Sequence, residues 1–498
     1  MKFLLLLLLG YSHPVFAGFC DRHVSTDTSV PLCPEKGGLL NETYPVVAAT
    51  VSDQVNQSIV TDFVTEMVRS GTSKPPAIFV SSESDCSYVR EHIDTLGLSA
   101  EKAQEWKAAI QCNQGVAWNW QQDFMQPYFD RNTGSAVVRF NPDYYNNDGP
   151  KAYGNLPAML QNCGGIQLGK NLSGRWNGNM GGNIEGLPNG LCAVGNDGLS
   201  DAEYKEMTDN ACEGADVITP PTSFMEVGHT DEIMKVIPTG GQPPCNYKIL
   251  VADTNLGEKL ISDSGNSPMF NDRNGAAQLF NGIHMLDLCK AWQRDQFDQD
   301  KKGSGTKSHT YLFEQLFIAK AYAGISVDTG DSSDKSSGKD SPNAGVFTFD
   351  ESKCSSMTGS DFATHYRKLY GPLNDEIGKE MDRFAEELRK KVGNQCGDPI
   401  VRVPMIFGSR HGPFDGNTSA EKIKGAHALS LFPNLTNGVS INGRTVFPKQ
   451  FNKPFDDYMS GLASKLGIQT GSINTVQQHN NQGNLHCSTN LVRYCRPR

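Results

Sequence analysis

The chain has 498 residues, and its 55 acidic residues outnumber its 45 lysines and arginines, which gives a net charge of -10 at pH 7. A negative balance favours cationic partners and argues against a protein that binds nucleic-acid phosphates. After the first residues, no stretch approaches the roughly 20 apolar residues that a membrane-spanning helix needs, so a membrane-spanning protein is also excluded. The length allows two to four ordinary domains, or one large α/β domain with insertions.

The first 17 residues, MKFLLLLLLGYSHPVFA, combine one positive charge, an apolar run and a small final residue, Ala17. This layout predicts a secretory signal peptide that is cleaved after Ala17, and therefore a secreted, extracellular protein. Asn-x-Ser/Thr sequons predict a glycoprotein, although some of them are expected by chance. They begin at Asn41, Asn56, Asn171, Asn417 and Asn434.

Thirteen cysteines fit an oxidising compartment, where disulfide bonds form and persist. Their odd number leaves at least one cysteine unpaired. If the other cysteines pair, the protein has about six disulfide bonds and one reduced thiol. That thiol is either a reactive group or a spare buried cysteine.

From residue 45 onward, the pattern predicts a strand over 45–51, a helix over 53–69, a strand over 76–82 and a helix over 85–100. Strands that alternate with helices at this spacing indicate α/β layering. The following region, residues 130–215, is rich in glycine and asparagine and is predicted to be largely irregular.

In the second half, residues 246–253 predict a buried strand, and the predicted helices over 276–293 and 309–323 belong to an insertion. Two polar stretches, 298–308 and 328–345, lie on either side of the second helix. They do not match a calcium-binding EF-hand loop and are predicted to be solvated linkers.

Further on, apolar residues at helical spacing predict a helix over 374–392, and a strand over 400–407 follows it. Near the end, residues 432–441 are strand-like and residues 455–466 form an amphipathic segment.

Three short stretches gather unlike reactive groups that neither helix nor strand propensity requires. WQQDFMQ contains Asp123, VGHTDE contains His229 and Asp231, and NLHCSTN contains Cys487. A cysteine with a histidine could form a thiol protease, because the imidazole can generate the thiolate and protonate the leaving amine. Two further carboxylates instead suit a guanidinium, which is planar, always charged and able to form two-pronged pairs with carboxylates.

These stretches resemble the motifs of the vertebrate protein-arginine deiminases, in the same order and with the nucleophile near the C-terminus. The matching segments are Trp120 to Asp123, Val227 to Glu232, and His486 to Asn490. GGNIE, from Gly181 to Glu185, resembles a fourth family motif, and the segments FPNLTNG and LGIQTGSINTV are also similar. The resemblance extends from about Ala77 to the C-terminus with large insertions.

This resemblance implies the α/β pentein fold, a five-bladed propeller of ββαβ modules, here with insertions. It places the catalytic domain at 44–498, after an N-terminal extension at 18–43, and leaves no room for the family's two immunoglobulin-like domains. The implied activity is that of a secreted protein-arginine deiminase, which hydrolyses the arginine guanidinium to citrulline and ammonia through a covalent cysteine thiouronium intermediate.

The resemblance also assigns roles to individual residues. Asp123 and Asp231 would bind the guanidinium, His229 would act as general acid and then general base, and Cys487 would attack the central carbon. Trp120 would pack against the methylene stem of the substrate arginine, although it could equally be a core tryptophan.

The sequence departs from the family at its calcium ligands. Phe124 and Gln126 stand where the family has acidic residues, while Gln122 and Glu185 keep a partial match. Calcium prefers several oxygen ligands with carboxylate charge, so we expect no metal and no organic cofactor, with calcium possible but dispensable.

The expected partners are arginine-containing proteins or peptides, and the oligomeric state stays open. Asn481 stands where the family has a substrate-contacting arginine. Two alternatives therefore remain: a deiminase of free arginine or another small guanidine, and an inactive secreted pentein that only binds.

Overall fold

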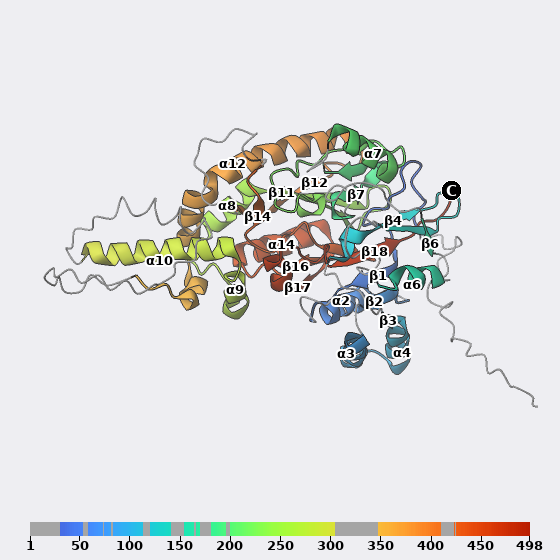
Figure 1. Cartoon of the computed structure of the whole chain (residues 1–498), viewed down its shortest axis with the longest axis horizontal. Helices are drawn as coiled ribbons and strands as arrows, with labels where there is room; N and C mark the ends of the chain where they lie inside the picture. Colours follow the sequence, from blue (N-terminus) through green and yellow to red (C-terminus); the bar gives the residue numbers. More distant parts are fainter. Residues whose placement is uncertain are drawn as a thin grey trace, which may run out of the picture.

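The computed structural model describes residues 30–52, 58–72, 74–80, 83–112, 120–140, 154–163, 166–169, 181–195, 200–303, 347–409, 423 and 425–498. Within these ranges the protein is a mixed α/β structure (Figure 1). The predicted signal peptide at 1–17, the predicted helix at 309–323 and the sequon residues Asn56, Asn171 and Asn417 lie outside the described residues.

Five of the six sheets in the described structure contain the same three-strand unit. In each unit, two antiparallel strands are followed by a third strand that is parallel to the second. A parallel third strand requires a crossover connection, and a helix provides it in every unit. The pattern of each unit is therefore strand, strand, helix, strand.

The first four units follow one another along the chain. The first unit comprises β4 (Met125–Phe129), β5 (Ala136–Phe140), α6 (Leu156–Asn162) and β6 (Ile166–Leu168), and the second comprises β7 (Ile184–Gly186), β8 (Cys192–Val194), α7 (Asp201–Cys212) and β9 (Val217–Ile218). The third comprises β10 (Met234–Pro238), β11 (Tyr247–Asp253), α8 (Thr254–Asp263) and β12 (Ile400–Pro404). The fourth comprises β15 (Val439–Ile441), β16 (Arg444–Pro448), α14 (Lys453–Leu466) and β17 (Gln469–Ile473).

The fifth unit joins the two ends of the chain. Its first strand is β18 (Thr489–Arg493), which pairs antiparallel with β1 (Val46–Val51), and α2 (Ser58–Arg69) leads on to the parallel strand β2 (Ala77–Val80). A fourth strand, β3 (Ile110–Cys112), extends this sheet. The segment that carries Cys487 is thereby placed directly before a strand that pairs with the first strand of the structure.

The third unit contains a large insertion between α8 and β12. It includes α9 (Arg273–Leu279), α10 (Ile283–Gly303) and α12 (Gly359–Val392). The predicted helix over 374–392 is confirmed as the C-terminal part of α12, where Ile377, Met381 and Phe384 are buried in one stripe. In Figure 1, α10 projects from the body and α12 runs along one side of it.

Several predicted boundaries were wrong, for local reasons. The helix predicted over 85–100 ends early, as α3 (Glu83–Ile93); Gly97 then adopts a left-handed conformation with φ 69°, and Ser99 caps a separate helix, α4 (Ala100–Ala109). The helix predicted over 276–293 is interrupted between α9 and α10.

Three predicted irregular or extended regions also differ. The glycine-rich stretch 130–215 contains the strands β5 to β8 in its described parts, because short buried strands carry little periodic signal. Of the strand predicted over 432–441, only β15 at its end is extended. The strand predicted over 400–407 is divided between β12 and β13 (Phe407–Ser409).

Disulfide bonds connect distant parts of the fold. The pairs are Cys33–Cys495, Cys86–Cys112, Cys192–Cys212, Cys245–Cys396 and Cys289–Cys354, and Cys163 is disulfide-bonded as well. Cys487 is the free cysteine among the described residues. A disulfide between Cys487 and Cys495 is therefore excluded, and the unpaired thiol lies at the predicted nucleophile.

The described part of the predicted extension, residues 30–43, packs against the body. Leu32 pairs with Arg496 in an isolated bridge, and Leu39 is buried against β7 and β8 residues in a small apolar cluster.

Among the described residues, no helix has both the length and the apolar character that crossing a membrane requires.

Candidate active site

The four residues predicted for catalysis come from three elements and are all buried. Asp123 lies on the short helix α5 (Gln121–Phe124), His229 caps the 3-10 turn η7 (Thr230–Glu232), Asp231 lies within that turn, and Cys487 lies in the turn before β18. Their exposed fractions are 5%, 1%, 0% and 4%.

The turn that carries Cys487 is fixed by backbone hydrogen bonds. Within the turn, Ser488 N donates to Asn484 O at 3.1 Å and Thr489 N donates to His486 O at 3.1 Å. Gln122 N donates to Cys487 O at 3.2 Å, which joins this turn to α5. The helix that carries Asp123 is thus attached directly to the nucleophile turn.

Asn437 holds the cysteine from the other side. Its Nδ2 donates to Cys487 Sγ at 3.1 Å, and its Oδ1 accepts from Cys487 N at 3.2 Å. Its backbone oxygen accepts from His486 N at 3.0 Å. A donor on the sulfur favours the thiolate over the thiol, and the three contacts together fix the direction in which Sγ points.

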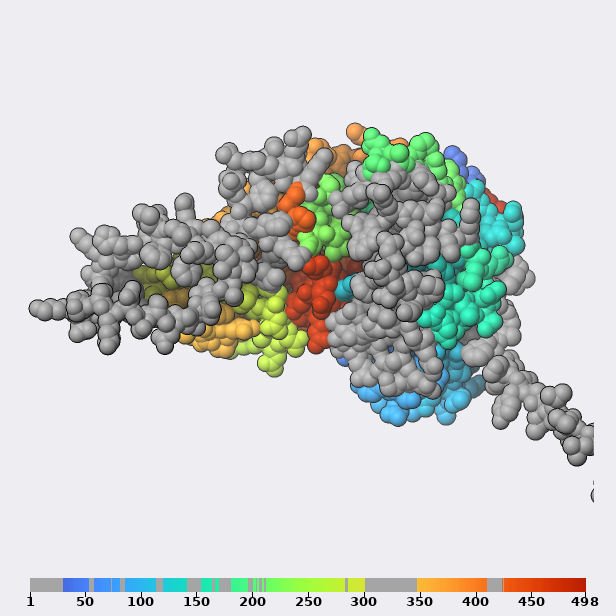
Figure 2. Space-filling view, in the orientation of Figure 1, coloured from blue at the N-terminus to red at the C-terminus, as the bar shows by residue number. Residues whose placement is uncertain are grey.

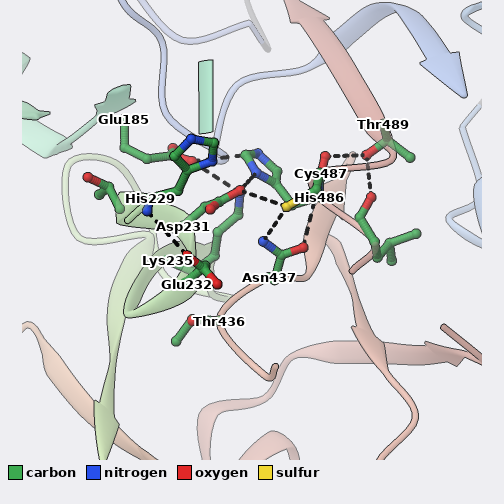
Figure 3. A network of polar contacts seen from close by, with 12 residues as sticks. Glu185, His229, Asp231, Glu232, Lys235, Thr436, Asn437, His486, Cys487 and Thr489 are labelled. Carbon is green, nitrogen blue, oxygen red and sulfur yellow. Dashed lines mark hydrogen bonds and ion pairs between the residues drawn. The ribbon is translucent and has the colours of Figure 1, made fainter. Parts of the chain in front are cut away.

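Asp231 lies between the thiol and a second histidine (Figure 3). His486 Nδ1 donates to Asp231 Oδ2 at 2.7 Å, and the same oxygen is 3.7 Å from Cys487 Sγ. The other oxygen, Oδ1, is buried and has no hydrogen-bond partner among the described residues. Buried polar atoms are nearly always bonded, so this oxygen is a natural acceptor for a ligand that brings N–H groups.

His229 lies beside the second carboxylate. Its Nδ1 is 3.9 Å from Asp123 Oδ1, and Glu232 Oε2 accepts from the backbone N of His229 at 3.2 Å. Gly182 packs against this histidine: a Cβ at Gly182 would lie 2.7 Å from His229 Nδ1 and 3.2 Å from Asp231 Oδ2. The GGNIE motif therefore contributes a glycine that allows the two residues to approach the backbone closely.

The charges around the thiol are mainly negative. Burial raises the pKa of Cys487 well above its usual range, and Asp231, Asp123 and Glu232 raise it further. Burial alone would also raise the pKa of Asp231, but its hydrogen bond to His486 and the positive charges nearby lower it. The site thus contains an ionised carboxylate beside a protonated thiol, an arrangement that a bound cation would stabilise.

Trp120 is half-buried and packs against the chain that leads to the nucleophile. A Cβ at Gly483 would lie 2.4 Å from the Trp120 ring, so only glycine fits there. Gly483 lies four residues before Cys487, so the indole packs against the segment that leads to the nucleophile turn.

A layer of charged residues lies behind His486, and we call Glu42, Glu185, Lys235 and Arg493 the charged layer. His486 Nε2 is 3.5 Å from Glu185 Oε1. Lys235 Nζ is 3.7 Å from Glu185 Oε1 and 3.1 Å from Glu42 Oε1, and Arg493 pairs with Glu42 Oε2 at 2.9 Å.

The carboxylates of the charged layer have opposite pKa shifts. Burial opposes ionisation of Glu42, but Arg493, Lys235 and His486 outweigh it and lower the pKa of Glu42 to about 2. Burial dominates at Glu185 and raises its pKa, although Lys235 and His486 act in the other direction. The layer therefore holds Glu42 firmly as an anion.

The residues at the family's calcium positions do not fit a calcium ion. Phe124 is fully buried and offers no ligand, and Gln126 offers only a neutral carbonyl oxygen. Glu185 supplies a carboxylate, but the Lys235 ammonium already lies 3.7 Å from it. Among the described residues, no group of three or more His, Cys, Asp or Glu side chains is placed to hold a metal ion.

Sequence reasoning gave no role to several residues that complete this geometry. His486 and Asn437 lay within quoted motifs, so their position beside Cys487 and near the end of FPNLTNG was a usable signal. Lys235 carried no signal, since it lies in no motif, and Glu42 was only the variable residue of the Asn41 sequon. Asn434, one of the predicted glycosylation sites, is buried, and its Nδ2 donates to Glu232 O at 2.6 Å, so this sequon serves the site structurally.

No family model and no curated protein matches the chain. Among solved structures, it is similar to C. jejuni agmatine deiminase, with 10% identity, a TM-score of 0.46 and coverage of 92% of this chain and 97% of that one. A Porphyromonas gingivalis protein assigned as an arginine deiminase shows 13% identity, a TM-score of 0.46 and coverage of 93% and 100%. A protein assigned as a peptidyl-arginine deiminase shows 10% identity, a TM-score of 0.46 and coverage of 92% and 99%.

Proposed function

We propose that this protein is a secreted protein-arginine deiminase that hydrolyses the arginine guanidinium to citrulline and ammonia. The observation that carries the proposal is the buried contact between the Cys487 thiol and Asp231, whose second oxygen lacks a hydrogen-bond partner among the described residues, with His229 and Asp123 beside them. A nucleophile, an acid-base group and two carboxylates are the set that guanidinium hydrolysis requires.

The negative site and the cationic substrate are complementary. A guanidinium bound between Asp231 and Asp123 offsets the charges that raise the pKa of Cys487, so the thiolate forms more readily once the substrate is present. The same carboxylates hold the positive charge in place while the central carbon becomes tetrahedral. Substrate binding and activation of the nucleophile are thereby coupled.

The reaction then proceeds in two halves. The Cys487 thiol passes its proton to His229 as the sulfur bonds to the guanidinium carbon. The carbon-nitrogen bond to one terminal nitrogen then breaks as His229 gives that proton to the departing amino group, which leaves as ammonia. This leaves an S-alkylthiouronium on Cys487. His229 next removes a proton from a water molecule, whose oxygen bonds to the same carbon, and the carbon-sulfur bond breaks to release citrulline.

The repeated three-strand units support a pentein architecture. We propose that the five units surround the site as a five-bladed propeller that forms one catalytic domain from 44 to 498, after a signal peptide at 1–17 and an extension at 18–43. The labels of the units follow one another around the body in Figure 1. The site residues also come from successive units or from the segments that join them, as a shared central site requires.

A pocket beside the site supports a peptide substrate. It is lined by Glu232, by apolar residues such as Leu279, Met285 and Leu431, and by the amides of Asn480 and Asn484. Figure 2 shows the segments that contain these residues meeting on one face of the molecule. Apolar side chains with a few amides suit a peptide backbone and its neighbouring side chains. Trp120 would then border the methylene stem of the arginine.

An assay with matched guanidines tests the activity and its substrate class. We expect citrulline to form from benzoyl-arginine amide and from an arginine-containing peptide, and more slowly from free arginine or agmatine. A preference for free arginine or agmatine would favour the small-guanidine alternative. If no guanidine releases ammonia, the protein is a binding protein with this fold rather than a deiminase.

We further expect activity to survive removal of calcium. Phe124 and Gln126 stand at the positions where calcium ligands were expected from the resemblance. Binding of a hard divalent cation depends on carboxylate charge as well as on the number of ligands. The measurement is citrulline formation after dialysis against EGTA, with and without added calcium. Activity that vanishes in EGTA and returns only with calcium would contradict a metal-independent site.

Secretion fits the disulfide bonds, which persist in oxidising compartments. The expected partners are accordingly extracellular proteins or peptides that contain arginine. We propose no organic cofactor, because each step above uses side chains and water.

A further inference from the structure

Lys235 is a buried ammonium at the centre of the charged layer. It is 1% exposed, and its Nζ lies between Glu42 at 3.1 Å and Glu185 at 3.7 Å. Removing a lysine from water is costly unless carboxylates compensate for the lost hydration. A buried lysine on an otherwise apolar strand is therefore an unusual element that requires a reason.

The strand β10 explains how Lys235 reaches this position. Met234 and Val236 pack into one apolar cluster, so Lys235 between them points to the opposite face of the strand. The strand begins three residues after Asp231, at the end of the turn that carries the site. The same short segment thus fixes both the carboxylate next to the thiol and the ammonium behind it.

A continuous series of polar contacts connects Lys235 to the thiol. Glu185, which lies next to Lys235, is 3.5 Å from His486, and His486 is 2.7 Å from Asp231. Asp231 in turn is 3.7 Å from Cys487 Sγ. His486 thus has a carboxylate beside each ring nitrogen: Asp231 accepts a hydrogen bond from Nδ1, and Glu185 lies within ion-pair distance of Nε2. The position of Glu185 therefore bears on the ring that contacts Asp231.

Arg493 cannot replace Lys235 in this series. It pairs with Glu42 Oε2 and donates to the backbone oxygens of Tyr44 and Ser440. Arg493 therefore contacts Oε2 of Glu42, whereas Lys235 contacts Oε1. Among the described residues, the structure gives Lys235 as the one lysine or arginine that pairs with Glu185.

We propose that Lys235 is a positioning residue that acts as an internal cation, fixing Glu185 and, through His486, holding Asp231 in the orientation that receives the guanidinium. This inference rests on the proposed function. The ammonium is the positive partner of Glu185, so the chain itself supplies the positive charge there. The site is then assembled as soon as the protein folds.

The test compares Lys235→Met, Lys235→Arg and Val236→Ala. Methionine keeps a similar length without the charge, arginine keeps the charge, and alanine at Val236 weakens packing on the opposite face of the same strand. We expect Lys235→Met to lower kcat/KM for benzoyl-arginine amide by roughly 10- to 100-fold, the range for losing a group that orients a residue at the reacting centre. Lys235→Arg should restore at least part of this loss, and Val236→Ala should lower Tm while keeping kcat/KM near that of the unmodified protein.

A second readout does not depend on turnover. If Lys235 holds Asp231 through Glu185 and His486, the rate at which iodoacetamide alkylates Cys487 should change in Lys235→Met but not in Val236→Ala. This readout separates the inference from the proposed function: absence of citrulline in the unmodified protein would reject the deiminase, whereas the alkylation rates would still test Lys235. Equal alkylation rates and equal kcat/KM for Lys235→Met and Val236→Ala would overturn the inference.

If Lys235→Met does not fold, Glu185→Gln tests the same link. Glutamine keeps the shape of the side chain and removes the charge that joins Lys235 to His486. We expect a loss of kcat/KM in the same range, and normal kinetics in this variant would reject the proposed role of Lys235.

Discussion

Replacing Cys487 with alanine is expected to abolish citrulline formation and leave the fold intact. Both halves of the proposed reaction need the sulfur, since one forms the covalent intermediate and the other breaks it. Cys487 takes part in no disulfide, so its loss removes no covalent cross-link. The measurements are citrulline formation with benzoyl-arginine amide and the Tm of the variant.

Cys289→Ala is the matched control. It removes the bond to Cys354, which lies in the insertion, and loss of a native disulfide typically costs about 2–5 kcal/mol of stability. We expect this variant to have a lower Tm and to keep its activity at low temperature. Substantial turnover by Cys487→Ala would remove Cys487 from its role as nucleophile.

Asp231→Asn is expected to lower kcat/KM by about a hundredfold or more. Truncating or neutralising one partner of a buried charge pair costs on the order of 3–5 kcal/mol, and each 1.4 kcal/mol is roughly tenfold in rate. Asparagine would also weaken the hydrogen bond that His486 Nδ1 donates at 2.7 Å. Asp123→Asn should show a loss of similar size if the two carboxylates share the guanidinium.

Asp94→Asn provides the control for these two variants. Asp94 is an exposed residue whose side chain pairs with Lys107 at the surface, and surface substitutions of this kind usually change stability by less than about 0.5 kcal/mol. The comparison uses kcat and KM measured separately for each variant. Near-normal kinetics for both Asp231→Asn and Asp123→Asn would contradict the site as described.

Local patterns predicted those parts of the fold in which each segment buries one face. The stripe that contains Ile377 and Met381 gave the helix α12, and the run NYKILVAD gave the buried strand β11. The short strands β7 and β8 were missed because three residues are too few to show a period. Gly97 and Ser99 divided a predicted helix, because turn and capping residues interrupt a pattern that otherwise continues.

The reactive residues of the site could be predicted from motifs, but their supports could not. Cys487, His229, Asp123 and Asp231 stood in stretches with distinctive composition. The contact between Lys235 and Glu42 joins residues from different parts of the chain, and no local pattern records such a pairing. Asn437 lies within a quoted motif, but that motif does not record its contact with Cys487, which is 50 positions away.

The pairing of β1 with β18 determines when the site can exist during biosynthesis. β1 is among the first described elements to leave the ribosome, and its antiparallel neighbour is the last strand to follow. The bond between Cys33 and Cys495, with a sequence separation of 462, can form only at that late stage. Cys487 and Asn437, which contacts its sulfur, also belong to the final part of the chain. A nascent polypeptide therefore carries an unpaired sheet edge, and the site is not assembled until translation has passed β18.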